Sequence, residues 1–346
     1  MKHVLRFLAL SLAVMLSACG KAPLVQTQSY VFGTLVDISI DGETEAKAHA
    51  AISHILQDFQ RLHQHYHAWQ PDSELSKLNQ SFAAGKAPVA ISPELAKMLT
   101  QAQTLSEQSQ GLFNPAIGGL IGLWGFQRDE FSPVDIDDQA IQKLLKAHPQ
   151  MSDIVINNNT AYSTNPAVKL DLGGYAKGYA LDMALLELHQ QGIKNALVNI
   201  GGNIIALGQH GDKPWRVGIQ HPRQPKPMAT LDLPSGWAIG TSGDYQRYFE
   251  QGGKRYCHII DPRTAYPAQG TQAVTVLLPP SAQAGVLSDV ASKPIFLSAP
   301  AQRASAAKAM GVEAYLLVDA HGDVTLSAAM NQRIHWLVKP ARVTVQ

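Results

Sequence analysis

The sequence predicts a mixed α/β fold in which short strands alternate with amphipathic helices. β-branched and aromatic residues form short runs bounded by Gly, Asn and Pro, which is typical of strands. Between several of these runs, apolar residues recur every three or four positions, as they do on the buried face of a helix. The 346 residues are 45% hydrophobic and show no internal repeat. Such a chain can bury one large core or two fused ones.

The first half of the chain is expected to form one strand followed by helices. Residues 30–40 are rich in β-branched side chains and predict the strand. Thr44 suits the N-cap of a helix over 44–63, because apolar residues follow it at helical spacing. Further helices are predicted near 94–109 and 138–148. The last of these opens with acidic residues, which suit the positive end of a helix.

The second half predicts short strands interrupted by a few helices. From residue 154 onwards, strands are expected at 168–172, 196–200, 204–207, 216–220, 229–233, 255–260, 273–278, 315–318 and 324–326. Helices are expected at 175–191, 282–298 and 301–310.

The N-terminus has the pattern of a secretory signal peptide over residues 1–18. Lys2 and Arg6 precede an apolar run of about ten residues, well short of the roughly 20 that span a bilayer. The run ends at LSAC (16–19), which resembles a bacterial lipobox and predicts that Cys19 is acylated, for example with palmitate. The alternative is ordinary cleavage after a small residue. The lipobox implies a membrane lipoprotein facing the periplasm, on a tether over 19–28, and Gly20 favours the outer membrane.

Charge and cysteine content narrow the function classes. The formal charge of +1 argues against a nucleic-acid-binding protein, which usually carries a basic excess. Cys257 is the only cysteine besides Cys19, so the mature chain has no pair for an internal disulfide. Cys257 precedes His258, but neighbours in a strand point to opposite faces, so we expect a packed thiol rather than a nucleophile.

Glycine-rich turns and one histidine carry the signs of chemistry. The turns are DLGGYAKG (171–178), NIGGN (199–203) and TSGDY (241–245), and HIIDPR (258–263) follows them. Paired glycines let backbone N–H groups approach a phosphate, and Lys177 adds positive charge. His258 and Asp261 are candidates for general acid–base chemistry. Each feature alone also has a structural reading, as a tight turn or a packed histidine.

Taken together and in order, these segments resemble the signature blocks of the ApbE family, the FAD:protein FMN transferases. WQPDSELSKLN (69–79), GLFNP (111–115) and LWGF (123–126) match as well. The resemblance covers residues 29–335 and implies a T-fold-like architecture of mixed sheets with packed helices. It also implies a single FAD-binding catalytic domain over 29–340.

The resemblance implies that FMN passes from FAD to a threonine of another protein, with release of AMP and help from Mg²⁺. His258 would be the base, and Asp261 would orient it or hold the loop. Metal ligands would be Gly174, Asp289, Ser292 and the residue at position 293, which is Lys293 in this chain. FAD would contact Phe32, Ala68, Trp69, Gln70, Gly111, Leu112, Phe113, Asp171, Lys177 and Ile260. Acceptors would be flavin-carrying subunits such as those of Na⁺-translocating NADH:quinone oxidoreductase.

Lys293 departs from the family pattern, which has threonine at this position. An ammonium group has donors only and cannot bind a metal ion. Either Lys293 turns out to solvent, which we favour, or its charge partly replaces the metal. Pro294 suits only the first turn of a helix, so the helix is expected to start later here than in relatives.

Two other functions stay open at this stage. An FAD pyrophosphatase would use the same site with water in place of threonine. The third interpretation is a non-catalytic FAD-binding lipoprotein, and it stays open because Lys293 occupies the position of a metal ligand. His63, His65 and His67 resemble a metal site on paper, but exposed histidines explain them more simply.

Overall fold

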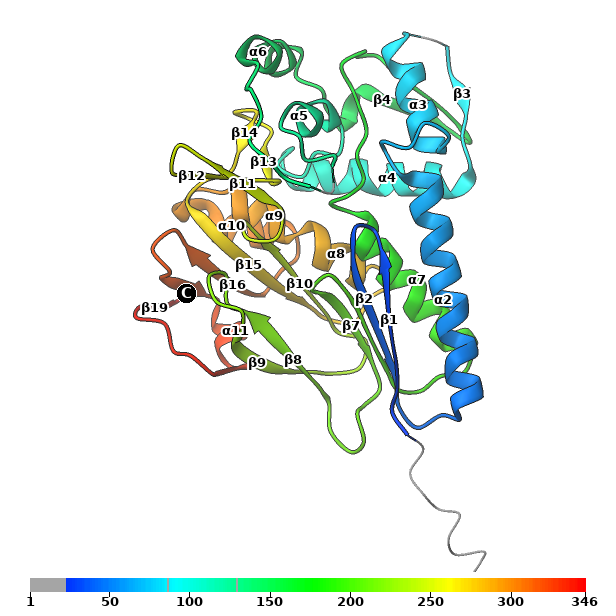
Figure 1. The fold of residues 1–346 in the computed structure, drawn as a ribbon, viewed down its shortest axis with the longest axis vertical. Coiled ribbons are helices and arrows are strands. Elements are labelled where there is room, and N and C mark those ends of the chain that lie inside the picture. Colours follow the sequence, from blue (N-terminus) through cyan, green and yellow to red (C-terminus); the bar gives the residue numbers. More distant parts are fainter. Residues whose placement is uncertain (1–22, 86, 129) are drawn as a thin grey trace, which may run out of the picture.

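The computed structural model describes residues 23–85, 87–128 and 130–346, so the predicted signal peptide and Cys19 lie outside the described part. A nine-stranded sheet forms the centre of the fold (Figure 1). Its order is β1 (Val25–Val31), β2 (Thr34–Ile40), β6 (Ala196–Ile200), β7 (Asn203–Leu207), β10 (Ala238–Gly243), β15 (Thr271–Leu278), β16 (Ala314–Asp319), β17 (Val324–Leu326) and β19 (Val343–Val345).

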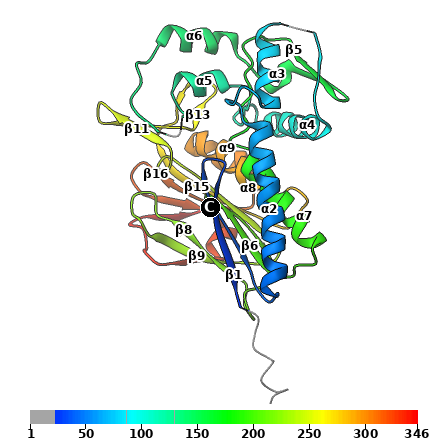
Figure 2. The same cartoon turned by 45° about the vertical axis from the view of Figure 1, so that its right-hand side comes forward.

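Helices cover one face of this sheet, and a small second sheet covers part of the other. The helices are α2 (Glu45–Tyr66), α7 (Ala176–Gln190), α8 (Ala284–Val290), α9 (Ser292–Leu297) and α10 (Arg303–Ala309). Figure 2 shows α2 lying along the edge of the sheet beside β1. The small sheet has the order β18 (Ile334–Trp336), β9 (Pro227–Leu233) and β8 (Trp215–Gln220).

Strand periodicity explains the two cores on either side of the large sheet. Along β15, Val274 and Val276 pack under the helices, whereas Ala273 and Leu277 pack against the small sheet. Because successive side chains point to opposite faces, a strand apolar throughout is expected only where both faces are covered. All eight residues of β15 are buried, in agreement with this position.

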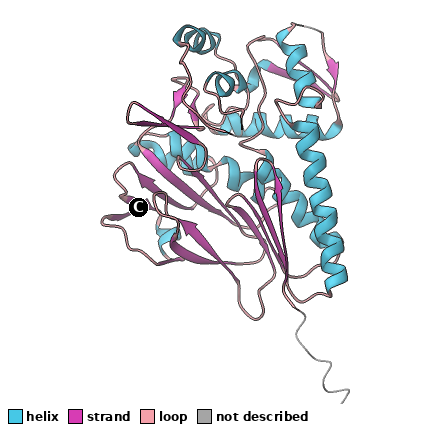
Figure 3. Ribbon diagram, in the orientation of Figure 1, coloured by secondary structure: helices cyan, strands magenta, loops and turns pink. Residues whose placement is uncertain are grey.

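A second group of elements lies above one end of the sheet (Figure 3). Its helices are α3 (Glu74–Ala83), α4 (Pro93–Gln108), α5 (Gly118–Leu123) and α6 (Asp138–Ala147). Three small sheets complete it. One has the order β3 (Val89–Ala90), β5 (Thr160–Ser163) and β4 (Ile154–Asn157), and the other two are the pairs β11 (Tyr248–Gln251) with β12 (Lys254–Cys257) and β13 (Ile260–Asp261) with β14 (Tyr266–Pro267). Short helices elsewhere are Met151–Asp153, Pro300–Gln302 and α11 (Ala328–Asn331).

The mixed α/β class is confirmed, but several predicted boundaries are wrong. The predicted strand 30–40 is a hairpin, and it begins at Val25, so residues 25–28 of the expected tether belong to the sheet. Residues 168–172 form no regular strand. The predicted helix 282–298 is two short helices, α8 and α9, and residues 255–260 divide between two sheets.

Capping residues account for the helix starts that the sequence did predict. Thr44 accepts a hydrogen bond from the N–H of Lys47, as expected of an N-cap. Asp137 is the N-cap of α6 and accepts one from the N–H of Ala140. The helix α2 continues to Tyr66, so His63 and His65 lie in its last turns. Within the described ranges, no helix is long and apolar enough to cross a membrane.

Candidate active site

A cavity of about 460 Å³ lies between the end of the large sheet and the group of elements above it. This volume is in the range of small-molecule sites. Its walls come from segments far apart in the sequence: the β1–β2 turn, residues 112–117, the 171–177 turn, the end of β10, residues 258–260 and the start of α9. The glycine-rich turns that the sequence pointed out therefore do meet at one place.

Phe32 lines the cavity from the tip of the first hairpin. Phe32 and Gly33 both have positive φ, at 57° and 68°, which matches the two-residue turn that joins tightly twisted antiparallel strands. Gly33 adopts this conformation without strain, whereas Phe32 does so at some cost. The turn places an aromatic ring at the mouth of the cavity, beside Phe59 at 5.7 Å between ring centroids.

Trp69 holds Asp171 rather than lining the cavity. Its indole Nε1 donates a 2.8 Å hydrogen bond to Asp171, and the N–H of Gly173 donates another of 2.8 Å. The Lys169 ammonium lies over the Trp69 ring, 3.6 Å from its centroid. These contacts fix the Asp171 carboxylate at the cavity wall, so Trp69 acts through Asp171.

Asp289 lies at the cavity wall, where it is buried and surrounded by hydrogen-bond donors. Lys293 lies 2.8 Å from one carboxylate oxygen, and Lys177 lies 3.5 Å from the other, which also accepts a 3.2 Å hydrogen bond from the N–H of Gly178. Burial opposes ionisation, but the charges of Lys177 and Lys293 outweigh it and hold the pKa of Asp289 well below its usual range. The carboxylate is therefore ionised.

Lys293 points inward, contrary to the favoured expectation that it would turn out to solvent. Only 17% of its side chain is exposed, and its ammonium also donates a 2.7 Å hydrogen bond to the backbone carbonyl of Asp289. Pro294 follows in the first turn of α9, where its missing N–H costs nothing, and this turn directs Lys293 back over α8.

The donor set around Asp289 does not suit Mg²⁺. Mg²⁺ prefers about six oxygen ligands near 2.1 Å. One oxygen of Asp289 is held by Lys293, and the other by Lys177 and Gly178. Ser292 shares its hydroxyl with Ser242 at 2.7 Å and with the Asp289 carbonyl at 3.0 Å. A divalent ion would therefore have to compete with the Lys293 ammonium for the Asp289 carboxylate.

His258 lies on the opposite wall with one ring nitrogen engaged. Its Nδ1 is 3.3 Å from the carbonyl oxygen of Arg247, so a proton on Nδ1 leaves Nε2 as the acceptor. Burial, together with the positive charges of Arg247, Lys177 and Lys293, lowers the pKa of His258 to about 3. The ring is neutral at physiological pH, which is the state that a general base requires.

Asp261 faces a different partner. Its carboxylate binds Arg263 through 2.9 and 2.7 Å hydrogen bonds and also accepts from the N–H of Arg263. Arg263 in turn donates to the carbonyl of Leu297, at the end of α9. Of the two roles expected for Asp261, these contacts match the one in which it holds the loop.

The predicted FAD-binding residues divide into two groups. Residues at the cavity wall are Phe32, Leu112, Phe113, Asp171, Lys177 and Ile260, and Gly174, His258, Asp289 and Lys293 join them. The others lie behind the wall. Ala68 and Gln70 use their carbonyls to hold the start of α3, and Gly111 makes a positive-φ turn that presents Leu112 and Phe113. Ser292 lies beneath the cavity and is buried.

Sequence reasoning missed one charged group of the cavity. Arg247 lines the wall, donates to the carbonyl of Phe126 at 3.2 Å and lies 5.1 Å from the ring of Phe131. No local pattern marks Arg247, and only the fold brings it to His258. Its charge adds to those of Lys177 and Lys293.

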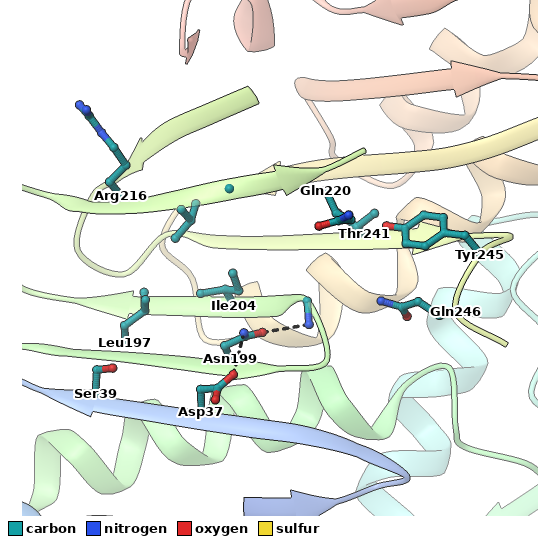
Figure 4. Close-up of a pocket in the computed structure, with 13 residues that line it drawn as sticks. Asp37, Ser39, Leu197, Asn199, Ile204, Arg216, Gln220, Thr241, Tyr245 and Gln246 are labelled. Carbon is teal, nitrogen blue, oxygen red and sulfur yellow. Dashed lines mark hydrogen bonds between the residues drawn. The ribbon is translucent and has the colours of Figure 1, made fainter. Parts of the chain in front are cut away.

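A second hollow, of about 580 Å³, lies between the large sheet and strand β8 of the small sheet (Figure 4). Its charged groups are paired within the protein: Asp37 accepts from Asn199 at 3.2 Å, and the exposed Arg216 pairs with Asp232. It shares Thr241 and Gln246 with the first cavity. Since it offers no cluster of cations, the first cavity suits a phosphate-bearing ligand better.

A sequence model of the ApbE family matches residues 32–316. This chain belongs to the ApbE family. It is 41% identical over 326 residues to an FAD:protein FMN transferase of Rhodobacter capsulatus, covering 94% of this chain and 61% of that protein's length. It is 32% identical to an FAD:protein FMN transferase of Haemophilus influenzae, covering 83% of this chain and 86% of that protein.

Solved ApbE structures share the fold. The ApbE protein of Thermotoga maritima superposes with a TM-score of 0.80 at 29% identity, over 90% of this chain and 99% of that one. The flavin transferase ApbE of Vibrio cholerae gives 0.77 at 26% identity, over 90% of this chain and 99% of that one. The comparisons thus confirm the family and the mixed ApbE architecture that the sequence predicted.

Proposed function

We propose that this ApbE protein transfers FMN from FAD to a threonine hydroxyl of a partner protein and releases AMP. One observation carries the proposal: a neutral histidine, His258, and three cationic side chains, Lys177, Arg247 and Lys293, line the same cavity. The cations suit a diphosphate, and the histidine suits deprotonation of a hydroxyl. The related FAD:protein FMN transferases support the choice of ligand.

The residues of the cavity suggest the steps of the reaction. The threonine Oγ attacks the FMN-side phosphorus while its proton passes to Nε2 of His258. The bond between this phosphorus and the bridging oxygen breaks, and AMP leaves with the electron pair. The other ring proton stays on Nδ1, which donates it in a hydrogen bond to the carbonyl oxygen of Arg247, and this contact fixes the tautomer. Lys177 and Arg247 offset the negative charge that develops on the phosphates.

The resemblance implies Mg²⁺ in addition, but the contacts of Asp289 do not support a metal-binding arrangement. Where the ion is bound in a site of this kind, it neutralises phosphate charge. In this chain the ammonium groups of Lys177 and Lys293 lie against the Asp289 carboxylate at the cavity wall, and the proposed steps use no metal ion.

The test is to incubate a soluble form, lacking residues 1–19, with FAD and a flavin-carrying subunit of Na⁺-translocating NADH:quinone oxidoreductase, in parallel with Mg²⁺ and with EDTA. We expect an FMN-sized mass gain on one threonine, in step with AMP release. If AMP and FMN form while the subunit stays unmodified, water is the nucleophile and the protein is an FAD pyrophosphatase. If FAD binds and stays intact both with Mg²⁺ and with EDTA, the protein is a non-catalytic flavin carrier.

For its location, we propose a bacterial lipoprotein anchored through Cys19, with the domain facing the periplasm and the outer membrane favoured. The proposal rests on the lipobox-like segment LSAC and on Gly20. Its acceptors would then be membrane redox subunits exposed on the same side. Labelling cells with a palmitate analogue should mark the wild-type protein but not Cys19→Ala. Density fractionation of membranes would show whether the protein is in the inner or the outer membrane. Equal labelling of both proteins would contradict the anchor.

A further inference from the structure

Lys293 and Asp289 form an ion pair at the wall of the cavity. The two residues are four apart and span the junction of α8 and α9. The ammonium donates to the Asp289 carboxylate at 2.8 Å and to the Asp289 carbonyl at 2.7 Å. A threonine in place of Lys293 is too short to hold both oxygens and carries no charge.

The Lys293 side chain also packs against the glycine-rich turn that contains Gly173 and Gly174. A Cβ added at Gly174 would lie 2.7 Å from Cε of Lys293, so the stem packs directly on the backbone of the second turn glycine. Gly174 therefore leaves room for the lysine. The ammonium ends at the cavity wall among Gly174, Lys177 and Asp289.

The hydrogen-bond capacity of the ammonium leaves one donor for a ligand. An ammonium group has three N–H donors, and two of them are used by Asp289. The third is available at the wall that Lys293 shares with Lys177. Three cations and two carboxylates, Asp171 and Asp289, line this cavity, so its fixed charge is positive and suits an anion.

We propose that the ammonium of Lys293 takes the place of the divalent cation, binding the diphosphate of FAD and making the transfer independent of Mg²⁺. The inference rests on the proposed function. When the bridging P–O bond breaks, the AMP phosphate gains negative charge, and Lys293 with Lys177 stabilises it at short range. No proton or electron is required from Lys293, which stays protonated throughout. Asp289 then serves to hold this ammonium.

The experiment compares wild type with Lys293→Thr and Lys293→Met, with Lys308→Met as a matched control. Lys308 is exposed on α10, away from the cavity. Transfer to the redox subunit is followed with excess EDTA and with excess Mg²⁺. FAD affinity is measured by quenching of flavin fluorescence, and binding of Mn²⁺ to the FAD-loaded proteins by electron paramagnetic resonance. Thermal unfolding checks that each variant is folded.

In EDTA we expect wild type and Lys308→Met to keep their Mg²⁺ rates within about twofold. Lys293→Thr should lose roughly 100-fold and bind FAD about tenfold more weakly, as loss of a charge-assisted hydrogen bond predicts. Mg²⁺ should restore Lys293→Thr, which should also bind Mn²⁺ more tightly than wild type. Lys293→Met should lose the same transfer rate in EDTA, and Mg²⁺ should not restore it.

The inference is overturned if EDTA abolishes transfer by wild type and Mg²⁺ restores it, because Lys293 must then leave Asp289. The proposed function would survive that result. If wild type transfers no FMN under any condition, the proposed function fails instead. The Mn²⁺ measurement still decides the role of Lys293 in that case, because tight binding by wild type contradicts it.

Discussion

The carboxylate of Asp182 on α7 accepts a 2.7 Å hydrogen bond from the backbone N–H of Gly285, near the start of α8. The N–H of Val286 donates to the same carboxylate at 2.9 Å. These bonds satisfy two of the N–H groups that a helix start leaves unpaired. Since α8 carries Asp289, the side chain of Asp182 fixes the helix that sets the floor of the active site.

Asp182 should make stability depend on pH. Burial raises the pKa of Asp182 to about 7, despite the two N–H donors, whereas an unfolded aspartate titrates near 3.9. Between these values the folded state binds more protons, so the free energy of unfolding falls as pH rises from about 4 to about 7. We expect wild type to lose several degrees of Tm relative to Asp182→Asn over this window.

Thermal unfolding of both proteins from pH 4.5 to 7.5 measures this difference. Asp72→Asn, at an exposed position with the same chemical change, should follow wild type at every pH. Parallel curves for wild type and Asp182→Asn would show that Asp182 does not titrate in this range.

Replacing His258 with alanine should lower transfer by about 10²- to 10⁴-fold, the usual range for a general base. FAD affinity should change less than about threefold, since the predicted role concerns the attacking hydroxyl. His335→Ala, on the exposed side of β18, is the control. Single-turnover transfer with saturating FAD separates the two effects. If His258→Ala keeps the wild-type transfer rate, His258 is not the general base.

The transfer rate should not fall through protonation of His258 as pH is lowered from 8 to about 5. Burial, aided by nearby cations, lowers the pKa of His258 to about 3, so the ring stays neutral where a free histidine would be protonated. Transfer rates from pH 5 to 8 in wild type and in Arg247→Gln test this point. Removing the Arg247 charge should raise the pKa of His258. An inflection near 6.5 in wild type would contradict its neutral, buried state.

Trp69→Phe should weaken FAD binding by about tenfold through Asp171. The ring would remain beneath Lys169, but the Nε1–H bond to Asp171 would be lost, and hydrogen bonds to charged groups contribute about 1.5–3 kcal/mol. Fluorescence titration with FAD measures the loss, and Trp336→Phe, on β18, is the control. If Trp69 contacted the flavin only through its ring, Trp69→Phe would bind nearly normally.

Cys257 should be chemically silent in the folded protein. It is 1% exposed, its thiol lies near the carbonyls of Ile259 and Ala268, and burial raises its pKa to about 12. The form lacking residues 1–19 has no other cysteine. Iodoacetamide should therefore label no residue under native conditions and one in denaturant, as read by mass spectrometry. Rapid native labelling would reopen a role for the thiol.

The sequence predicted elements best where the signal is local. Helices such as α2 and α4 carry strong periodicity and caps, and their predicted limits agree within a few residues. The helix predicted over 282–298 is two short helices with a break at Ala291, because Pro294 has no N–H to donate to the carbonyl of Val290 and so interrupts the helical hydrogen bonds. The single strand over 30–40 failed because a Phe–Gly pair is a weak turn signal.

By itself, the sequence determined the mixed α/β class, the family, and the glycine-rich segments that contribute to the cavity wall, because turns and strand ends have recognisable residue patterns within a few positions. Only the tertiary structure decided what long-range contacts control: that Arg247 meets His258, that Trp69 acts through Asp171, and that Lys293 turns inward onto Asp289. The direction of a long side chain depends on the charge and space around it. For Lys293 these come from Asp289 and from the bare backbone of Gly174, which the fold brings together.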